Sequence, residues 1–198
     1  APTRPRIDND VPSSTVSSSC SPVGTARSAD RRRNGIGALP VEGTRRARRE
    51  DAERCGELCR EAIDQLQRAR GGPLFARRET GLIAKALLRP GGLDRLLADR
   101  RRRVLVGTVD DAVVGMAIGR IDEVGETPLG IVDACYVEPG ARCVGVGGAL
   151  LEDLVSWFST SGCRGVDVSA LPGDRDTKNL LEASGFKARL ITLHRTLG

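Results

Sequence analysis

The fold is decided by one segment of the chain, Val137-Glu138-Pro139-Gly140-Ala141-Arg142-Cys143-Val144-Gly145-Val146-Gly147-Gly148-Ala149-Leu150-Leu151. A β-type run ends at Val137, a Pro-Gly turn follows, and glycines then lead into an apolar run with helical spacing. A strand that passes through a glycine-rich loop into a helix forms a nest of backbone N–H groups, and the helix dipole makes this nest attractive to anions. The segment therefore predicts a site for phosphate oxygens, with a plain helix-start turn as the alternative.

The spacing within this loop differs from two common phosphate-binding motifs. The loop lacks the Gly-Lys-Ser/Thr of a P-loop, and it does not open with a glycine directly after the strand, as the dinucleotide-binding fingerprint does. Its pattern is instead Arg142-x-x-Gly145-x-Gly147. Glycine suits these positions because a bound ligand must approach the backbone closely, and Cβ atoms would obstruct it.

The net charge of +5 is concentrated near the N-terminus. Residues 1–49 contain ten Arg and four acidic residues, whereas residues 50–198 contain 21 basic and 22 acidic residues. A nucleic-acid-binding domain is expected to carry its positive charge on the folded part, so nucleic acid is not an expected partner. No run of about 18 uncharged apolar residues is present, which predicts no membrane span and a cytoplasmic protein.

The chain has six cysteines and one histidine. No two cysteines form a C-x-x-C pair, and His194 has no neighbouring cluster of ligand-type residues, so the sequence predicts no metal site. Cys55 and Cys59 lie one helical turn apart and are expected to be thiols of the hydrophobic core.

The sequence divides into two regions. Residues 1–42 are rich in Ser, Pro and Arg and lack apolar periodicity, which predicts a disordered basic tail. Residues 43–198 are expected to form one domain, with a first strand that begins just before it. The predicted strands are 41–46, 104–109, 112–121, 131–137, 166–171 and 188–195, and the predicted helices are 49–69, 80–88, 93–99, 147–161 and 175–183. A turn over 127–130 should precede the strand 131–137, and the strand 166–171 should be buried on both faces.

This order and several local motifs resemble the GNAT N-acetyltransferase superfamily. Besides the glycine loop, the similar segments are the hairpin 104–115, Arg45-Arg46-Ala47 followed by Glu50-Asp51, Leu171-Pro172-Gly173-Asp174, and Leu180-Leu181-Glu182-Ala183-Ser184-Gly185-Phe186. The resemblance covers residues 43–198. It implies a mixed α/β fold (α+β), with a mixed central sheet, a βαβ unit that binds acyl-CoA, and helices on both faces.

The resemblance also implies a reaction, in which acetyl-CoA or another acyl-CoA donates its acyl group to a primary amine. The acceptor would be a small molecule or a peptide, and the amine would attack directly in a ternary complex without a metal. A backbone N–H near Val137 would hold the oxyanion. The residues implied to bind the donor are Cys135, Tyr136 and Val137 on the strand, Arg142, Cys143, Val144, Gly145, Val146, Gly147 and Gly148 in the loop, and Asp174.

The sequence departs from the family at the loop and at the leaving-group position. Cys143 and Val144 stand where the family usually carries a glycine and a basic residue, and Asp174 replaces the motif asparagine. Leu181 matches the tyrosine that often protonates the departing thiolate. Leu181 and the unusual pair Cys143-Val144 favour an alternative function, a non-catalytic acyl-CoA-binding or scaffold domain.

The amine must lose a proton, since a free alkylammonium has a pKa near 10. Asp133 and Glu123 are the candidate bases, with Glu126 as a further one, and a water relay is the alternative to a side-chain base. Asp133 shares strand parity with Val137, so both side chains are expected to face the ligand cleft. The alternative is a structural carboxylate that is hydrogen-bonded to a neighbour or to Arg120. The sequence leaves a homodimer open.

Overall fold

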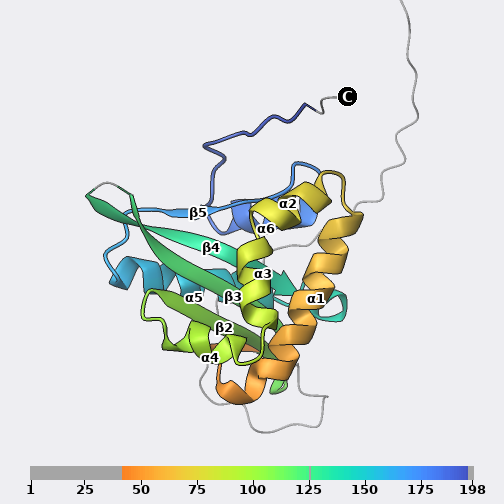
Figure 1. Cartoon of the computed structure of the whole chain (residues 1–198), viewed down its shortest axis with the longest axis vertical. Coiled ribbons are helices and arrows are strands. Elements are labelled where there is room, and N and C mark those ends of the chain that lie inside the picture. Colours follow the sequence, from red (N-terminus) through yellow and green to blue (C-terminus); the bar gives the residue numbers. More distant parts are fainter. Residues whose placement is uncertain (1–41, 125, 196–198) are drawn as a thin grey trace, which may run out of the picture. The chain divides into compact units, whose positions relative to one another are not determined.

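The computed structural model describes residues 42–124 and 126–195, and these residues contain one mixed five-stranded sheet (Figure 1). The strand order follows the chain, β1-β2-β3-β4-β5; the first four strands are antiparallel, and β5 runs parallel to β4. The bounds are β1 Glu42–Arg46, β2 Arg102–Val109, β3 Ala112–Val124, β4 Thr127–Val137 and β5 Val166–Val168. The predicted mixed α/β architecture is confirmed.

Helices from the first half of the described chain cover one face of this sheet (Figure 1). Helix α1 is amphipathic and buries Cys55, Leu58 and Cys59 against Val106 and Met116 of the sheet. The prediction of two core thiols is confirmed, and burial raises the pKa of Cys55 to about 12 and that of Cys59 to about 11. The elements here are a 3₁₀ turn at Arg49–Asp51, α1 Ala52–Arg68, α2 Gly72–Arg78, α3 Gly81–Leu88 and α4 Gly92–Ala98.

The opposite face is covered mainly by α5, Val146–Thr160, which connects β4 to β5. Its side chain Phe158 is fully buried and packs into space that two glycines leave open. A Cβ atom at Gly119 would lie 2.7 Å from the Phe158 ring, and one at Gly130 would lie 2.5 Å from it. The absence of these side chains therefore lets the aromatic ring reach the sheet. Helix α6, Arg175–Ala183, adds Leu181 to the same core.

Several sequence-based boundaries were wrong. Helix α2 was missed because Gly71-Gly72-Pro73 was interpreted only as the end of α1, whereas Pro73 lies in the first turn of α2, where a missing N–H costs little. Residues 127–130 belong to β4 and not to a separate turn. Strand β5 is shorter than predicted, and its three residues are half-buried on an edge of the sheet.

The final strand predicted over 188–195 is not formed. Residues 186–195 have no regular structure, and Leu190, Ile191 and Leu193 are largely exposed. The β-type pattern alone does not make a strand, because a strand needs hydrogen-bonding partners that this segment does not find on β5. Figure 1 shows the segment leading away from the sheet. The tail predicted for 1–42 lies outside the described residues, except for Glu42, which begins β1.

A buried carboxylate joins β1 to the start of α1. Asp51 accepts hydrogen bonds from Arg45 Nη1 at 2.7 Å, from Arg45 Nη2 at 2.8 Å and from the Arg48 backbone N–H at 2.7 Å. The side chain of Asp51 is only 6% exposed. The hydrogen bond from Arg45 is the main reason why the pKa of Asp51 lies below its ordinary value.

We expect Asp51→Asn to lower the free energy of unfolding by about 1–3 kcal/mol at pH 7, because it removes charge-assisted hydrogen bonds. The pKa of Asp51 is depressed in the folded state. The contribution of its carboxylate to the free energy of unfolding is therefore present above the unfolded pKa of about 3.9 and is lost as the pH falls below about 4. Urea unfolding at pH 7 and pH 3 measures both effects, and the loss should be smaller at pH 3. The control is Glu50→Gln, because the Glu50 side chain is 69% exposed. An equal loss in both variants would contradict the anchoring role of Asp51.

Candidate functional site

The glycine loop forms the N-terminus of α5, as predicted. Gly145 adopts φ +100° at the N-cap, and its carbonyl accepts the first intrahelical bond, from Ala149 N–H at 3.0 Å. The N–H groups of Val146, Gly147 and Gly148 belong to the first turn, where a helix has no internal acceptors for them. The space that a Cβ atom of Gly148 would enter is open, so a ligand can approach these donors.

Cys143 also adopts a left-handed backbone conformation, with φ +65°. An L-residue with a side chain pays roughly 1–2 kcal/mol for this conformation, whereas glycine does not. The geometry explains why a glycine is suitable at this position of the loop. The Cys143 thiol itself is exposed.

Strand β4 separates from β5 beside this loop. Among the described residues, β5 pairs only with Gly130, Ile131 and Val132 of β4, whereas β4 continues to Val137. The Glu138 N–H donates to the Val114 carbonyl at 3.0 Å, and this bond shows which residues of β4 direct their backbone groups toward β3. Because backbone groups alternate in an antiparallel ladder, those of Cys135 and Val137 point away from β3, toward the gap between β4 and β5.

Arg142 closes the end of this gap. Its Nε donates to the Val137 carbonyl at 2.9 Å, and its Nη2 donates to Gln65 Oε1 on α1 at 2.6 Å. Its guanidinium lies 5.6 Å from the centre of the Tyr136 ring, within the range of a cation–π contact. In this arrangement the side chain of Arg142 ties the loop to β4 and α1.

The sequence analysis missed a polar cluster between α1 and the end of β4, which we call the α1–β4 cluster. It consists of Arg54, Glu57, Glu61, Tyr136 and Glu138. Arg54 pairs with Glu57 at 3.0 Å, with Glu61 at 3.9 Å and with Glu138, and Tyr136 Oη donates to Glu61 Oε2 at 3.4 Å. The spacing of Glu57 and Glu61 placed them on one side of α1, but no local pattern showed that this side meets Tyr136.

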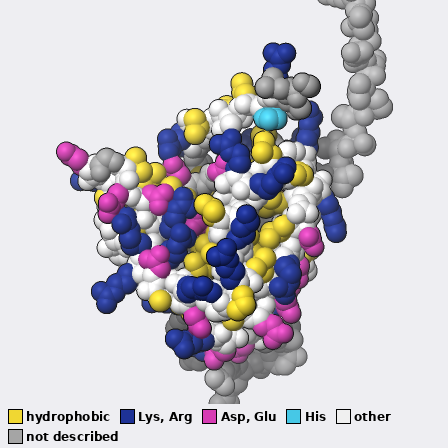
Figure 2. Space-filling model, in the orientation of Figure 1, with side chains coloured by type: hydrophobic (Ala, Val, Ile, Leu, Met, Phe, Trp, Pro, Cys, Tyr) yellow, Lys and Arg dark blue, Asp and Glu magenta, His cyan; other side chains and the backbone are white. Residues whose placement is uncertain are grey.

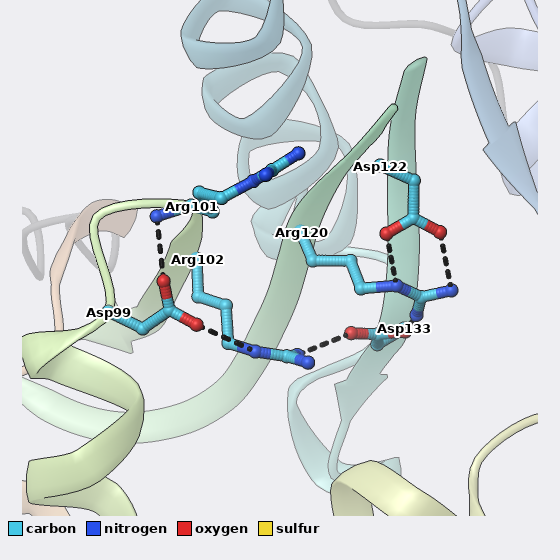
Figure 3. A network of polar contacts seen from close by, with 6 residues as sticks. All are labelled: Asp99, Arg101, Arg102, Arg120, Asp122 and Asp133. Atoms are coloured by element: carbon cyan, nitrogen blue, oxygen red, sulfur yellow. Dashed lines mark hydrogen bonds and ion pairs between the residues drawn. The ribbon is translucent and has the colours of Figure 1, made fainter. Parts of the chain in front are cut away.

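Asp133 lies between two guanidinium groups, those of Arg102 and Arg120 (Figure 3). Arg102 Nη1 lies 3.0 Å from Asp133 Oδ2, Arg120 Nη1 pairs with Asp133 Oδ1, and Arg120 Nε donates to Asp122 at 2.9 Å. The side chain of Asp133 is only 3% exposed. The structure therefore brings Asp133 and Arg120 together, which was the alternative drawn from the sequence.

The parity argument for Asp133 was wrong because β4 contains a bulge. Ile118 pairs with Ala134 and Gly119 with Val132, so Asp133 is an extra residue in β4. An extra residue reverses the alternation of side chains beyond it. The side chain of Val137 accordingly packs in the core beneath α5. Asp133 lies on the opposite face of the sheet, toward α1 and α4, because its partner Arg102 is on the same face of β2 as Val104.

The other predicted residues lie in different surroundings. Glu123 is 76% exposed and pairs with Arg101 at 3.0 Å, and Glu126 is exposed as well. Asp174 is the N-cap of α6 and accepts from Thr177 N–H at 3.1 Å and from Thr177 Oγ1 at 2.7 Å. Leu181 is buried in the core beneath α5. The structure thus brings the loop and the end of β4 together, while Asp133 and Glu123 lie elsewhere.

A surface hollow of about 480 Å³ adjoins the arginine pair and not the glycine loop. It is lined by charged side chains that already pair with one another, among them Asp99, Arg102, Arg120 and Asp122 (Figure 3). Figure 2 shows basic side chains interspersed with acidic and hydrophobic ones on this side of the protein. Within residues 42–124 and 126–195, no group of three His, Cys, Asp or Glu could hold a metal ion, and no helix is long and apolar enough to span a membrane.

Comparison with known families identifies the class of this protein. Residues 84–186, more than half of the chain, match the family described as the Acetyltransferase (GNAT) family. The chain belongs to this family. A search of curated proteins finds no match.

Solved structures share the fold at low sequence identity. An aminoglycoside N-acetyltransferase, AAC(6')-Iy in complex with CoA, is 18% identical, with a TM-score of 0.61 over 81% of this chain and 98% of that one. A transcriptional regulator from Bacillus halodurans C-125 is 18% identical, with a TM-score of 0.60 over 79% and 100%. A ribosomal-protein-alanine N-acetyltransferase from Brucella melitensis biovar Abortus 2308 is 22% identical, with a TM-score of 0.54 over 80% and 100%.

Asp133→Asn tests whether this carboxylate stabilises the sheet or accepts a proton. We expect the free energy of unfolding to fall by about 1–3 kcal/mol, because two arginines lose their shared charged partner. We expect the kcat for amine acetylation by the folded variant to change less than about threefold, whereas loss of a general base would lower it by about 10²–10⁴. Urea unfolding and a thiol-release assay at a temperature where the variant is folded measure the two effects. A large loss of kcat without a loss of stability would support Asp133 as the base.

Proposed function

We propose that the protein transfers an acetyl group from acetyl-CoA to a primary amine. The observation that supports this most directly is the position of the α5 N-terminus beside the gap between β4 and β5. The α5 N-terminus offers backbone donors to a pyrophosphate, and the gap offers the open edge of β4 to an extended chain. Acetyl-CoA has both parts, a pyrophosphate and an extended pantetheine arm.

The pyrophosphate would bind the backbone of residues 142–148. The first-turn N–H groups of α5 supply the donors, so the lack of a basic side chain at Val144 removes one contact and leaves the others. Arg142 shapes the loop through Val137 and Gln65. Asp174 stays a predicted donor-binding residue at the start of α6, but its carboxylate accepts from Thr177 and would repel the pyrophosphate, so any contact with the donor would be to another part of it.

The pantetheine arm would lie along Cys135, Tyr136 and Val137 like an added strand. The backbone groups of Cys135 and the N–H of Val137 point into the gap, whereas the Val137 carbonyl accepts from Arg142, so the Cys135 groups can pair with amide groups of the arm. The N–H of Val137 would then stabilise the negative charge that develops on the thioester oxygen as the amine attacks. No side chain of the protein needs to act as the nucleophile.

The leaving thiolate receives no proton from Leu181, which is buried among apolar side chains. A thiol with a pKa of about 8.5 is nevertheless a fair leaving group at neutral pH, so solvent can supply the proton. The acceptor would be a small-molecule or peptide amine; the similar structures include enzymes named for aminoglycosides and for a ribosomal-protein alanine. Asp133 and Glu123 stay predicted bases, but each already pairs with arginine, so we propose that a water relay accepts the proton of the attacking amine.

Leu181 also favours a second candidate function, an acyl-CoA-binding domain without catalysis. Both functions require the donor site, and only the first produces free thiol when acetyl-CoA and an amine are present. A thiol-release assay over a panel of primary amines therefore separates them. Binding without release would support the second.

Gly148→Glu should weaken acetyl-CoA binding by about 100-fold or more. A carboxylate within about 5 Å of the pyrophosphate costs roughly 3 kcal/mol at the effective dielectric constant of a protein surface. Stability should not fall, because the position is open and an acidic residue in the first turn of a helix is favourable. Titration calorimetry measures the affinity.

The matched control is Gly148→Ala, which adds a Cβ atom without charge and should change the affinity less than about tenfold. Equal affinity in the Glu variant and the natural chain would show that the pyrophosphate does not bind at this loop. A folded natural chain that does not bind acetyl-CoA would overturn the proposed function.

A further inference from the structure

We propose that Glu61 binds the acceptor in its ammonium form, before the amine loses its proton to water and attacks, and thereby selects a cationic amine. This inference rests on the proposed function, since it assigns the acceptor side of the same site. Three observations support it: the position of Glu61 relative to β4, the uneven sharing of Arg54 within the α1–β4 cluster, and the accessibility of the Glu61 carboxylate.

The position of Glu61 follows from its contact with Tyr136. Tyr136 lies on β4 between Cys135 and Val137, whose backbone groups face the gap proposed for the donor. Its side chain packs against the core beneath α1 and reaches Glu61 Oε2 at 3.4 Å. Glu61 is therefore one side chain away from the part of β4 where the thioester would lie, on the sheet face opposite α5.

The charges around Glu61 leave a negative excess. Glu57, Glu61 and Glu138 share Arg54, which also donates from Nε to the Val113 carbonyl at 2.9 Å. Arg54 forms hydrogen bonds with Glu57 and Glu138, but its distance to Glu61 is 3.9 Å, beyond a hydrogen bond. Of the three carboxylates, Glu61 is thus the one that Arg54 neutralises least.

The Glu61 carboxylate can accept a further donor. An ionised carboxylate has about four acceptor sites, and the bond from Tyr136 occupies one of them with a long hydrogen bond. The side chain is 44% exposed, so a solute can reach it. The guanidinium of Arg142 packs on the Tyr136 ring and donates to Gln65, and these contacts hold Tyr136 in place beside Glu61. A primary ammonium fits this position because it offers three donors and a positive charge.

Glu61→Gln tests the inference, with Glu57→Gln as its matched control. Both residues lie on α1, both side chains are 44% exposed, and both are near Arg54, but Tyr136 contacts only Glu61. The probes are an aminoglycoside, a linear polyamine and a short peptide with a free N-terminus, each with acetyl-CoA in a thiol-release assay. The kinetic constants are compared for whichever probe has the highest kcat/KM.

We expect Glu61→Gln to raise the KM for the amine by about 10-fold or more, and Glu57→Gln by less than about threefold. The Kd of acetyl-CoA should stay within about twofold in both variants, which shows that the donor site is intact. Tyr136→Phe, which removes only the hydroxyl, should raise the KM for the amine by a smaller factor than Glu61→Gln. Thermal unfolding checks that all three variants are folded.

Failure of this inference can be distinguished from failure of the proposed function. Turnover that is equally affected in the Glu61 and Glu57 variants would overturn the role of Glu61 and leave acyl transfer intact. No turnover with any of the three amines, in a chain that binds acetyl-CoA, would overturn both. An increase in the Kd of acetyl-CoA caused by Glu61→Gln would show that Glu61 supports the donor site instead.

Discussion

The site depends on an unequal pairing of β4, which has a long ladder with β3 and only three paired residues with β5. A buried strand whose backbone groups lack partners is costly, so most sheets continue their ladders. Here β5 ends at Val168, and the backbone groups of Cys135 and the N–H of Val137 face a gap, while the Val137 carbonyl accepts from Arg142. The β3 ladder and the α5 core hold β4 in place, so the open edge does not require β4 itself to be mobile.

The middle and the C-terminal end of β4 use charge in different ways. Near Asp133, two arginines pair with one carboxylate that is almost completely buried, so its negative charge has two cationic partners. Near Tyr136, three carboxylates share Arg54, and two of them remain 44% exposed. A balanced buried group contributes to the geometry of the sheet, whereas an exposed and under-neutralised group can attract a cationic solute. The bulge places the Asp133 carboxylate on the same sheet face as Tyr136, so the two environments are separated along β4 and not by the sheet.

The features that the sequence predicted well are local. The glycine loop, the start of α5 and the amphipathic α1 depend on residues that are close together in the chain, so spacing and residue type were sufficient. The bulge was not predictable in this way, because an extra residue in β4 is defined only by its pairing with Ile118 and Gly119 on β3. The contact between Glu61 and Tyr136 joins residues 75 positions apart, and no local pattern contains that information. The segment 188–195 shows the reverse error, since a β-type pattern was present and a partner strand was not.

The unusual loop residues are compatible with donor binding because recognition by a helix N-terminus uses the backbone. Replacing the usual basic residue by Val144 removes a side-chain contact, but the N–H groups of Val146, Gly147 and Gly148 keep their direction. Cys143 must still adopt a left-handed conformation, and its φ of +65° shows that the loop keeps this shape with a side chain present. The strain is local to Cys143, whereas the donors belong to the first turn of α5, which Val146 and Leu150 anchor in the core. The geometry that a pyrophosphate would require is therefore maintained by the helix and not by the identity of the residues at 143 and 144.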